Sequence, residues 1–135
     1  MSNETRITVL ISGSGTNLQA LINAQEKVLP SGSKIIRVIS NKKDAFGITR
    51  AQAAHIPTSY HNLLKYKKDP QHEGDVSKAR VAYDEDLAKM VLSDEPHLVV
   101  CAGFMHILSP GFLEPLEKGG VKIINLHPGM WLRFL

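Results

Sequence analysis

A chain of 135 residues that is 43% hydrophobic and 21% charged suits one folded domain and is too short for two. The small net charge of +3 and the 6% aromatic content give no indication of nucleic-acid binding. A single cysteine excludes a disulfide framework and a cysteine-only metal site, and favours a reducing compartment, the cytoplasm. The hydrophobic runs are too short for a signal peptide or a membrane span, so we expect no membrane partner.

Short runs of aliphatic and β-branched residues predict the strands of a parallel sheet, because strands buried on both faces are continuously hydrophobic. In chain order, these runs are 7–11, 35–39, 98–101 and 121–124, and the weaker run 57–60 predicts one more strand. Hydrophobic periodicity predicts helices over 16–27, 46–54, 77–93 and 110–116. Alternating strands and helices indicate an α/β fold with a mostly parallel sheet and helices on both of its faces.

Several polar features are interpreted as structural. We expect Ser14 or Thr16 to cap the first helix, and the polar stretch 65–75 to be a mobile loop. Four histidines lack metal-ligand spacing and are placed at the surface or at helix ends: His55, His61, His72 and His97. Three acidic residues are placed on a solvated helix face, paired with Lys89 or Arg80: Asp84, Glu85 and Asp86. Cys101 is assigned to the core, and no metal site is predicted.

The glycine-rich turn 12–18 follows the first predicted strand, where α/β sheets bind ligands. Gly13 and Gly15 allow the backbone to approach an anion, and the next helix offers unpaired N–H groups. A phosphate monoester is favoured over a dinucleotide, because Leu18 replaces the third glycine of the dinucleotide pattern and no acidic residue follows the second strand directly. The alternative is a plain glycine-rich turn.

The segment 102–110 follows the fourth predicted strand and stays hydrophobic after the strand ends. Surface loops are usually polar, so this segment is predicted to line a ligand cleft. Simple burial against the neighbouring helix is an equally good interpretation of its hydrophobic residues, Phe104, Met105, Ile107 and Leu108.

Asn125 and His127 end the last predicted strand, and their spacing points them to the same side. A neutral histidine accepts a proton near pH 7, and an amide donates a hydrogen bond to a developing oxyanion. This pair is therefore compatible with acyl transfer, and the alternative is a structural histidine at a strand end.

Taken together, the segments 11–19, 102–110 and 124–128 resemble the glycinamide ribonucleotide transformylases, which are phosphoribosylglycinamide formyltransferases. The stretches 40–47 and 80–84 are also similar to this family. The resemblance implies a Rossmann-like fold, with residues 1–128 forming the N-terminal nucleotide-binding domain of a formyltransferase and 129–135 an atypical C-terminal tail.

The resemblance implies formyl transfer from 10-formyltetrahydrofolate to glycinamide ribonucleotide in de novo purine (IMP) biosynthesis, with these two small molecules as partners and no metal. The implied phosphoribosyl-binding residues are Gly13, Ser14, Gly15, Thr16, Asn17, Gly103 and Met105. The implied folate-binding residues are Arg80, Phe104, His106, Ile107 and Leu108. Asn125 is implied to steady the formyl oxyanion and His127 to shuttle protons.

The sequence departs from the family in two places. His106 stands where the family usually has arginine or another residue, and the C-terminal third with its catalytic aspartate is not recognisable after residue 128. We therefore expect a truncated chain, and the alternative function is that of a catalytically impaired fragment that only binds the phosphoribosyl substrate. A nicotinamide dehydrogenase and another folate-dependent formyl enzyme, such as a formyl-folate hydrolase or a transfer-RNA formylase, are less favoured. The sequence does not define the oligomeric state.

Overall fold

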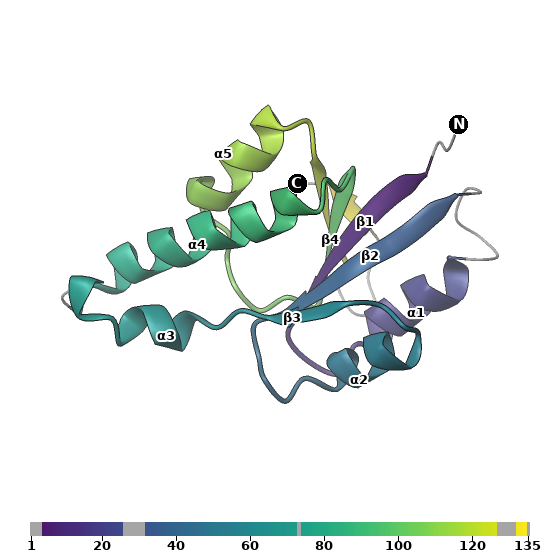
Figure 1. The fold of residues 1–135 in the computed structure, drawn as a ribbon, viewed down its shortest axis with the longest axis horizontal. Helices are drawn as coiled ribbons and strands as arrows, with labels where there is room; N and C mark the ends of the chain where they lie inside the picture. Colours follow the sequence, from purple (N-terminus) through teal and green to yellow (C-terminus); the bar gives the residue numbers. More distant parts are fainter. Residues whose placement is uncertain (1–3, 26–31, 73, 127–131, 135) are drawn as a thin grey trace.

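The computed structural model describes residues 4–25, 32–72, 74–126 and 132–134. One sheet contains the described strands in the order β3-β2-β1-β4-β5-β6 (Figure 1). The strands are β1 (Thr5–Ile11), β2 (Ser33–Ser40), β3 (Thr58–Tyr60), β4 (Leu98–Ala102), β5 (Lys122–Leu126) and β6 (Leu132–Phe134). Neighbouring strands from β3 to β5 are parallel, and the short β6 is antiparallel to β5. The predicted Rossmann-like, mostly parallel sheet is confirmed.

Helices cover both faces of this sheet, as the sequence predicts. They are α1 (Thr16–Ala24), α2 (Phe46–Ala53), α3 (Leu63–Lys67), α4 (Val76–Ser93) and α5 (Pro110–Lys118). In Figure 1, α1 and α2 lie on one side of the sheet, α4 and α5 lie on the other, and α3 runs beside the first half of α4. Within the described ranges, no helix has the length and apolar character that a membrane span requires.

Two helical differences from the sequence predictions stand out. The first helix ends at Ala24 and is shorter than predicted. The stretch 65–75, predicted as a mobile loop, contains the end of α3 and a 3-10 turn over Pro70–His72. Asn62 is the N-cap residue of α3, and its side chain accepts a hydrogen bond from the N–H of Leu64 at 2.7 Å. This cap explains why a polar stretch is helical here.

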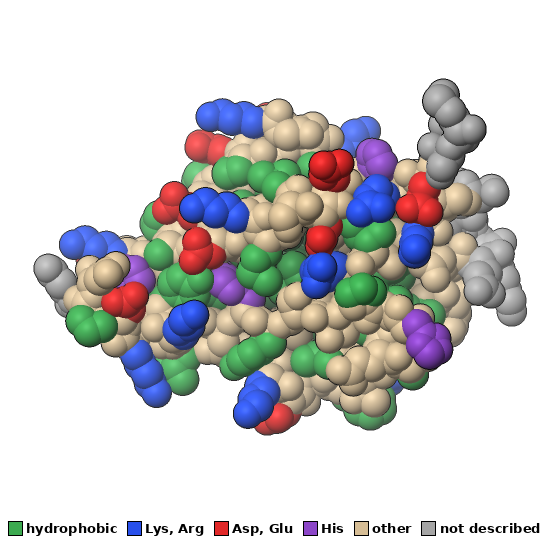
Figure 2. Space-filling view, in the orientation of Figure 1, with side chains coloured by type: hydrophobic (Ala, Val, Ile, Leu, Met, Phe, Trp, Pro, Cys, Tyr) green, Lys and Arg blue, Asp and Glu red, His purple; other side chains and the backbone are tan. Residues whose placement is uncertain are grey.

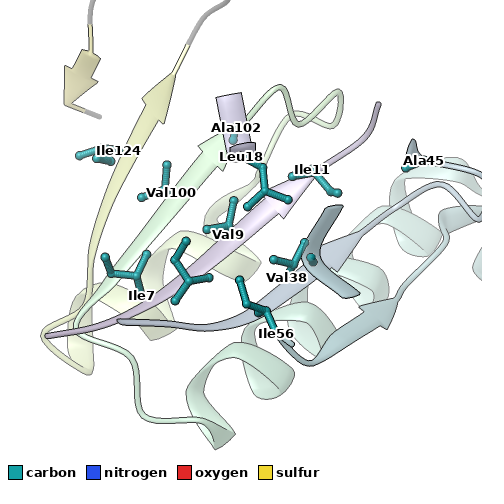
Figure 3. Packing of buried hydrophobic residues seen from close by; sticks show 12 residues of the cluster. Ile7, Val9, Ile11, Leu18, Val38, Ala45, Ile56, Val100, Ala102 and Ile124 are labelled. Carbon is teal, nitrogen blue, oxygen red and sulfur yellow. The ribbon is translucent and has the colours of Figure 1, made fainter. Parts of the chain in front are cut away.

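The core has two halves because successive residues of a strand point to opposite faces. Val9 and Ile11 of β1 pack with Leu18 in the cluster beneath α1 and α2. Figure 3 shows Val9 and Val100, from neighbouring strands, together with Leu18 in this cluster. Leu10 points the other way, into the cluster beneath α4 and α5. Residues 7–11 of β1 are therefore buried on both faces of the sheet.

Gly15 sets the position of the turn between β1 and α1. Its φ of 78° is left-handed, and a Cβ at this position would lie 2.5 Å from the Cα of Gly47 in α2. The N–H of Gly47 also donates a hydrogen bond to the carbonyl oxygen of Gly13 at 3.1 Å. Gly15 is the N-cap residue of α1 and no side chain caps the helix, so the expectation that Ser14 or Thr16 does so is wrong. Close contact between two backbones, and not a side-chain cap, fixes the position of this turn.

Replacing Gly15 with alanine is expected to lower the free energy of unfolding by at least about 2 kcal/mol, because the new Cβ meets both a left-handed backbone and the Gly47 backbone. Gly13→Ala is the matched control, since no heavy atom lies within 4 Å of a Cβ at that position. Urea unfolding of both variants measures the difference. Equal stability of the two variants would contradict this account of the turn.

Candidate functional site

A cavity of about 220 Å³ lies at the carboxyl ends of β1, β2 and β4. Its lining residues are Ser12, Gly13, Ser14, Gly15, Thr16, Asn17, Lys42, Ala102, Gly103 and Met105. The structure therefore brings together every residue that the sequence assigns to phosphoribosyl binding. They come from two segments that are about 90 residues apart in the chain and meet because β1 and β4 are neighbours in the sheet.

The electrostatics of this cavity suit an anion. The N-terminus of α1 lines the cavity with the positive end of its dipole, and the first turn of that helix contains no acidic residue. Lys42 adds a cationic side chain, and its N–H donates to the hydroxyl of Ser40 at 3.0 Å, which fixes the turn after β2. Sequence reasoning missed Lys42 as a site residue. The sequence signal that could have identified Lys42 was its position in the turn after β2, the strand that pairs with β1.

The Ser12 side chain links three segments beside this cavity. Its hydroxyl donates a hydrogen bond to Oδ1 of Asn41 at 2.6 Å and accepts one from the N–H of Met105 at 2.7 Å. Ser12 is only 2% exposed, so these hydrogen bonds are largely shielded from water. One buried hydroxyl thus joins the loops that follow β1, β2 and β4.

A second and larger cavity, of about 490 Å³, adjoins the first, smaller cavity at Met105, which lines both. The other lining residues are Cys101, Phe104, His106, Ile107, Leu108, Leu113 and Asn125. Asn125 enters from β5, where it pairs with Cys101 of β4. The larger cavity therefore brings Asn125 to the residues assigned to folate binding, except Arg80. Arg80 is exposed on α4 and lies outside both linings.

The hydrophobic segment after β4 both borders a cavity and packs against the core, which are the two interpretations that its sequence allowed. Met105 and Ile107 are 77% and 85% exposed and border the larger cavity. Phe104 and Leu108 are half-buried and pack against the core cluster beneath α4 and α5. Met105 and Ile107 therefore fit the ligand-cleft interpretation, whereas Phe104 and Leu108, which also line the larger cavity, fit both interpretations.

Asp84 and Asp86 contradict the prediction of a solvated acidic face. Asp84 is completely buried and accepts hydrogen bonds from His106 and Ser109, and Asp86 accepts one from the hydroxyl of Tyr66 at 2.6 Å. Their partners lie on α3 and on the loop before α5, not on α4 itself. Helical periodicity did not reveal that these segments cover this side of the helix. Glu85 is exposed, as expected.

His61 is also placed differently from the expectation of a surface or helix-end residue. It is buried, and its ring stacks on that of Tyr83 with 4.2 Å between the ring centroids. The hydroxyl of Tyr83 donates to the carbonyl oxygen of His61 at 2.8 Å, and burial lowers the pKa of the His61 imidazole. The residue belongs to an aromatic cluster beside α3. It borders a third cavity of about 440 Å³, which contains none of the predicted site residues.

Cys101 is a core residue, as predicted. Burial raises the pKa of its thiol to about 12, so the thiolate is disfavoured near pH 7. His127 lies outside the described residues, and its predicted role stays a prediction.

On the face drawn in Figure 2, side chains of both charges are interspersed over the region of α4 and α5. That pattern differs from the basic stripe that is typical of nucleic-acid interfaces.

The sequence profile of the family described as formyl transferase matches residues 5–134. The chain belongs to the formyl transferase family. The phosphoribosylglycinamide formyltransferase of Schizosaccharomyces pombe is 50% identical over 125 residues, which are 92% of this chain and 58% of that protein. The enzyme of the same name from Saccharomyces cerevisiae is 46% identical over 128 residues, with 93% and 59% covered.

Solved structures of this family have the same fold. The phosphoribosylglycinamide formyltransferase of Campylobacter jejuni superposes with a TM-score of 0.75 at 32% identity, over 95% of this chain and 60% of that one. The Coxiella burnetii protein of the same name also gives 0.75, at 36% identity, over 93% and 52%. This chain therefore spans between half and three fifths of the length of these relatives.

Replacing Ser12 with alanine is expected to cost about 1–3 kcal/mol of unfolding free energy, because the N–H of Met105 and the amide oxygen of Asn41 each lose a buried partner. Ser14→Ala, on the exposed side of the same turn, is the control and is expected to change stability by less than about 0.5 kcal/mol. Thermal or urea unfolding distinguishes the two variants. An unfolding free energy for Ser12→Ala that matches the control would show that the hydroxyl does not hold these loops together.

Proposed function

We propose that this chain carries the substrate-binding site of a phosphoribosylglycinamide formyltransferase of de novo purine biosynthesis. The observation that carries the proposal is the pair of adjoining cavities that share Met105. One has the features of a phosphate site, and the other is bordered by hydrophobic side chains and the Asn125 amide. A formyl transfer between two bound molecules needs two such sites in contact, because the reacting atoms must meet.

The smaller cavity binds the phosphate of glycinamide ribonucleotide. The backbone N–H groups at the start of α1, with Thr16 and Asn17, provide hydrogen bonds, and Lys42 provides positive charge. A monoester phosphate suits this cavity better than a dinucleotide, because Leu18 is fully buried in the core where the dinucleotide pattern requires glycine. The phosphate site favours the ribonucleotide over the substrates of other formyl transferases.

The larger cavity binds 10-formyltetrahydrofolate as the formyl donor. Its hydrophobic border, including Ile107 and Leu108, suits the flat pteridine ring, and its contact with the smaller cavity at Met105 brings the formyl group toward the ribonucleotide amine. Arg80 is exposed and is assigned to the anionic tail of the folate rather than to the ring. Both substrates are small molecules, and the single buried cysteine is in keeping with a cytoplasmic location.

The chemistry that this arrangement supports is a direct acyl transfer. The amino nitrogen of the ribonucleotide attacks the formyl carbon, the bond from that carbon to N10 of the folate breaks, and a proton moves from the amine to N10. The Asn125 amide donates a hydrogen bond to the formyl oxygen as negative charge develops there. His127 is assigned the proton transfer on the strength of its place two residues beyond Asn125 in the sequence.

Lys42→Ala is expected to weaken the binding of glycinamide ribonucleotide by about tenfold or more, since it removes a charge-assisted contact to phosphate. Lys43→Ala is a close control, because Lys43 is exposed next to Lys42 but does not line the cavity. Isothermal titration calorimetry at two salt concentrations measures both variants. Equal affinities for the two variants would remove Lys42 from the phosphate site.

Asn125→Ala is expected to lower the rate of formyl transfer by about 10²-fold, because the developing oxyanion loses its donor. Asn23→Ala, on the exposed surface of α1, is the control and retains the rate. The assay is spectrophotometric formyl transfer with both substrates present. A chain that binds the ribonucleotide and transfers no formyl group would support the alternative of a phosphate-binding protein without turnover.

A further inference from the structure

A completely buried carboxylate lies beside the larger cavity and has no part in the proposed chemistry. Asp84, on α4, has only 1% of its side chain exposed. Transfer of a charged group from water into a protein interior is costly unless hydrogen bonds replace its hydration. The neighbours that provide these hydrogen bonds therefore indicate what the residue does.

Within the described residues, the hydrogen-bond partners of Asp84 belong to the segment between β4 and α5. Nε2 of His106 donates to Oδ1 at 2.7 Å. The N–H of Ser109 donates to Oδ2 at 2.8 Å, and the hydroxyl of Ser109 donates to the same oxygen. Burial by itself raises the pKa of Asp84, but these hydrogen bonds outweigh it and hold the pKa below its ordinary value. Asp84 is therefore an ionised carboxylate that binds two residues of one loop.

The hydrogen bonds to Asp84 determine which side chains of this loop face outward. His106 is turned inward, with only 7% of its side chain exposed, and its ring lies edge-on to Tyr83 with 4.8 Å between the centroids. The residues on either side of it, Met105 and Ile107, are consequently directed outward to the larger cavity. Hydrogen bonds to side chains hold this loop at three places: Ser12 binds the N–H of Met105 near its start, and Asp84 binds His106 in its middle and Ser109 at its end.

We propose that Asp84 is a positioning residue for the formyl-folate cavity. Without touching the ligand, it fixes residues 105–109 through His106 and Ser109, so that Met105 and Ile107 form a preorganised border of the cavity. The inference rests on the proposed function, because it assigns the larger cavity to the folate. It also changes the expectation for His106, whose Nε2 is committed to Asp84 and supports the cavity instead of binding the folate tail through that atom.

The test compares Asp84→Asn with Asp86→Asn, which lies on the same helix and binds Tyr66 on the side of α3. An amide has one acceptor oxygen and cannot accept all of the hydrogen bonds that the carboxylate accepts. Affinities are measured for two probes, each added alone: 10-formyltetrahydrofolate for the larger cavity and glycinamide ribonucleotide for the smaller one. Circular dichroism melting shows whether each variant is folded.

The expected result is selective. Asp84→Asn weakens 10-formyltetrahydrofolate binding by about tenfold or more and changes ribonucleotide binding by less than about threefold, whereas Asp86→Asn leaves both affinities within about twofold. A merely structural role would lower both affinities together. If Asp84→Asn does not fold, Ser109→Ala replaces it, since this variant removes one donor and keeps the backbone N–H. A loss of about threefold, confined to the folate, is then expected.

Two other results have distinct meanings. If the unmodified chain binds 10-formyltetrahydrofolate and both Asp84→Asn and Ser109→Ala bind it equally well, Asp84 is not a positioning residue and the proposed function is unaffected. If the unmodified chain binds neither probe, the proposed function is contradicted, and the inference that rests on it falls with it.

Discussion

The arrangement of the site depends on one buried hydroxyl group. Ser12 follows the central strand β1 and hydrogen-bonds to Asn41 after β2 and to the backbone of Met105 after β4. Parallel strands bring their carboxyl ends to one edge of a sheet, but they do not fix the loops that follow them. Ser12 fixes these loops, the smaller cavity is built from the segments that it joins, and the larger cavity shares with it the segment after β4. The shared border at Met105 follows from this constraint.

The sequence predicted the parts of the structure that depend on local patterns. Continuous hydrophobic runs identified the parallel strands other than β3, and the turn from Gly13 to Asn17 identified the smaller cavity. These predictions succeeded because strand burial and glycine-rich turns leave a signal within a few consecutive residues. The segment after β4 was only half predictable, since Met105 and Ile107 border the cavity alone, whereas Phe104 and Leu108 line the cavity and also pack against the core. Only the fold determines which of them face which way.

Long-range partners were beyond the reach of the sequence. Asp84 was expected in solvent because helical periodicity shows which residues share a face and not which loop covers that face. His61 was expected at the surface, and its burial depends on Tyr83, a residue 22 positions further along the chain. Lys42 was missed because its place after the second strand indicates a site only once the pairing of β2 with β1 is known. All three residues are placed by tertiary contacts between elements that are distant in the chain.

The most direct test of the central claim is a ¹H–¹⁵N NMR titration of the chain with glycinamide ribonucleotide. The two-cavity account predicts saturable shifts of the amide signals of 13–17 and 103–105, which line the smaller cavity or adjoin it. It predicts unchanged signals for Lys65 and Tyr66, which line the separate cavity beside α3. Shifts centred on Lys65 and Tyr66, or no saturable shift of the signals of 13–17, would contradict the assignment of the phosphate site.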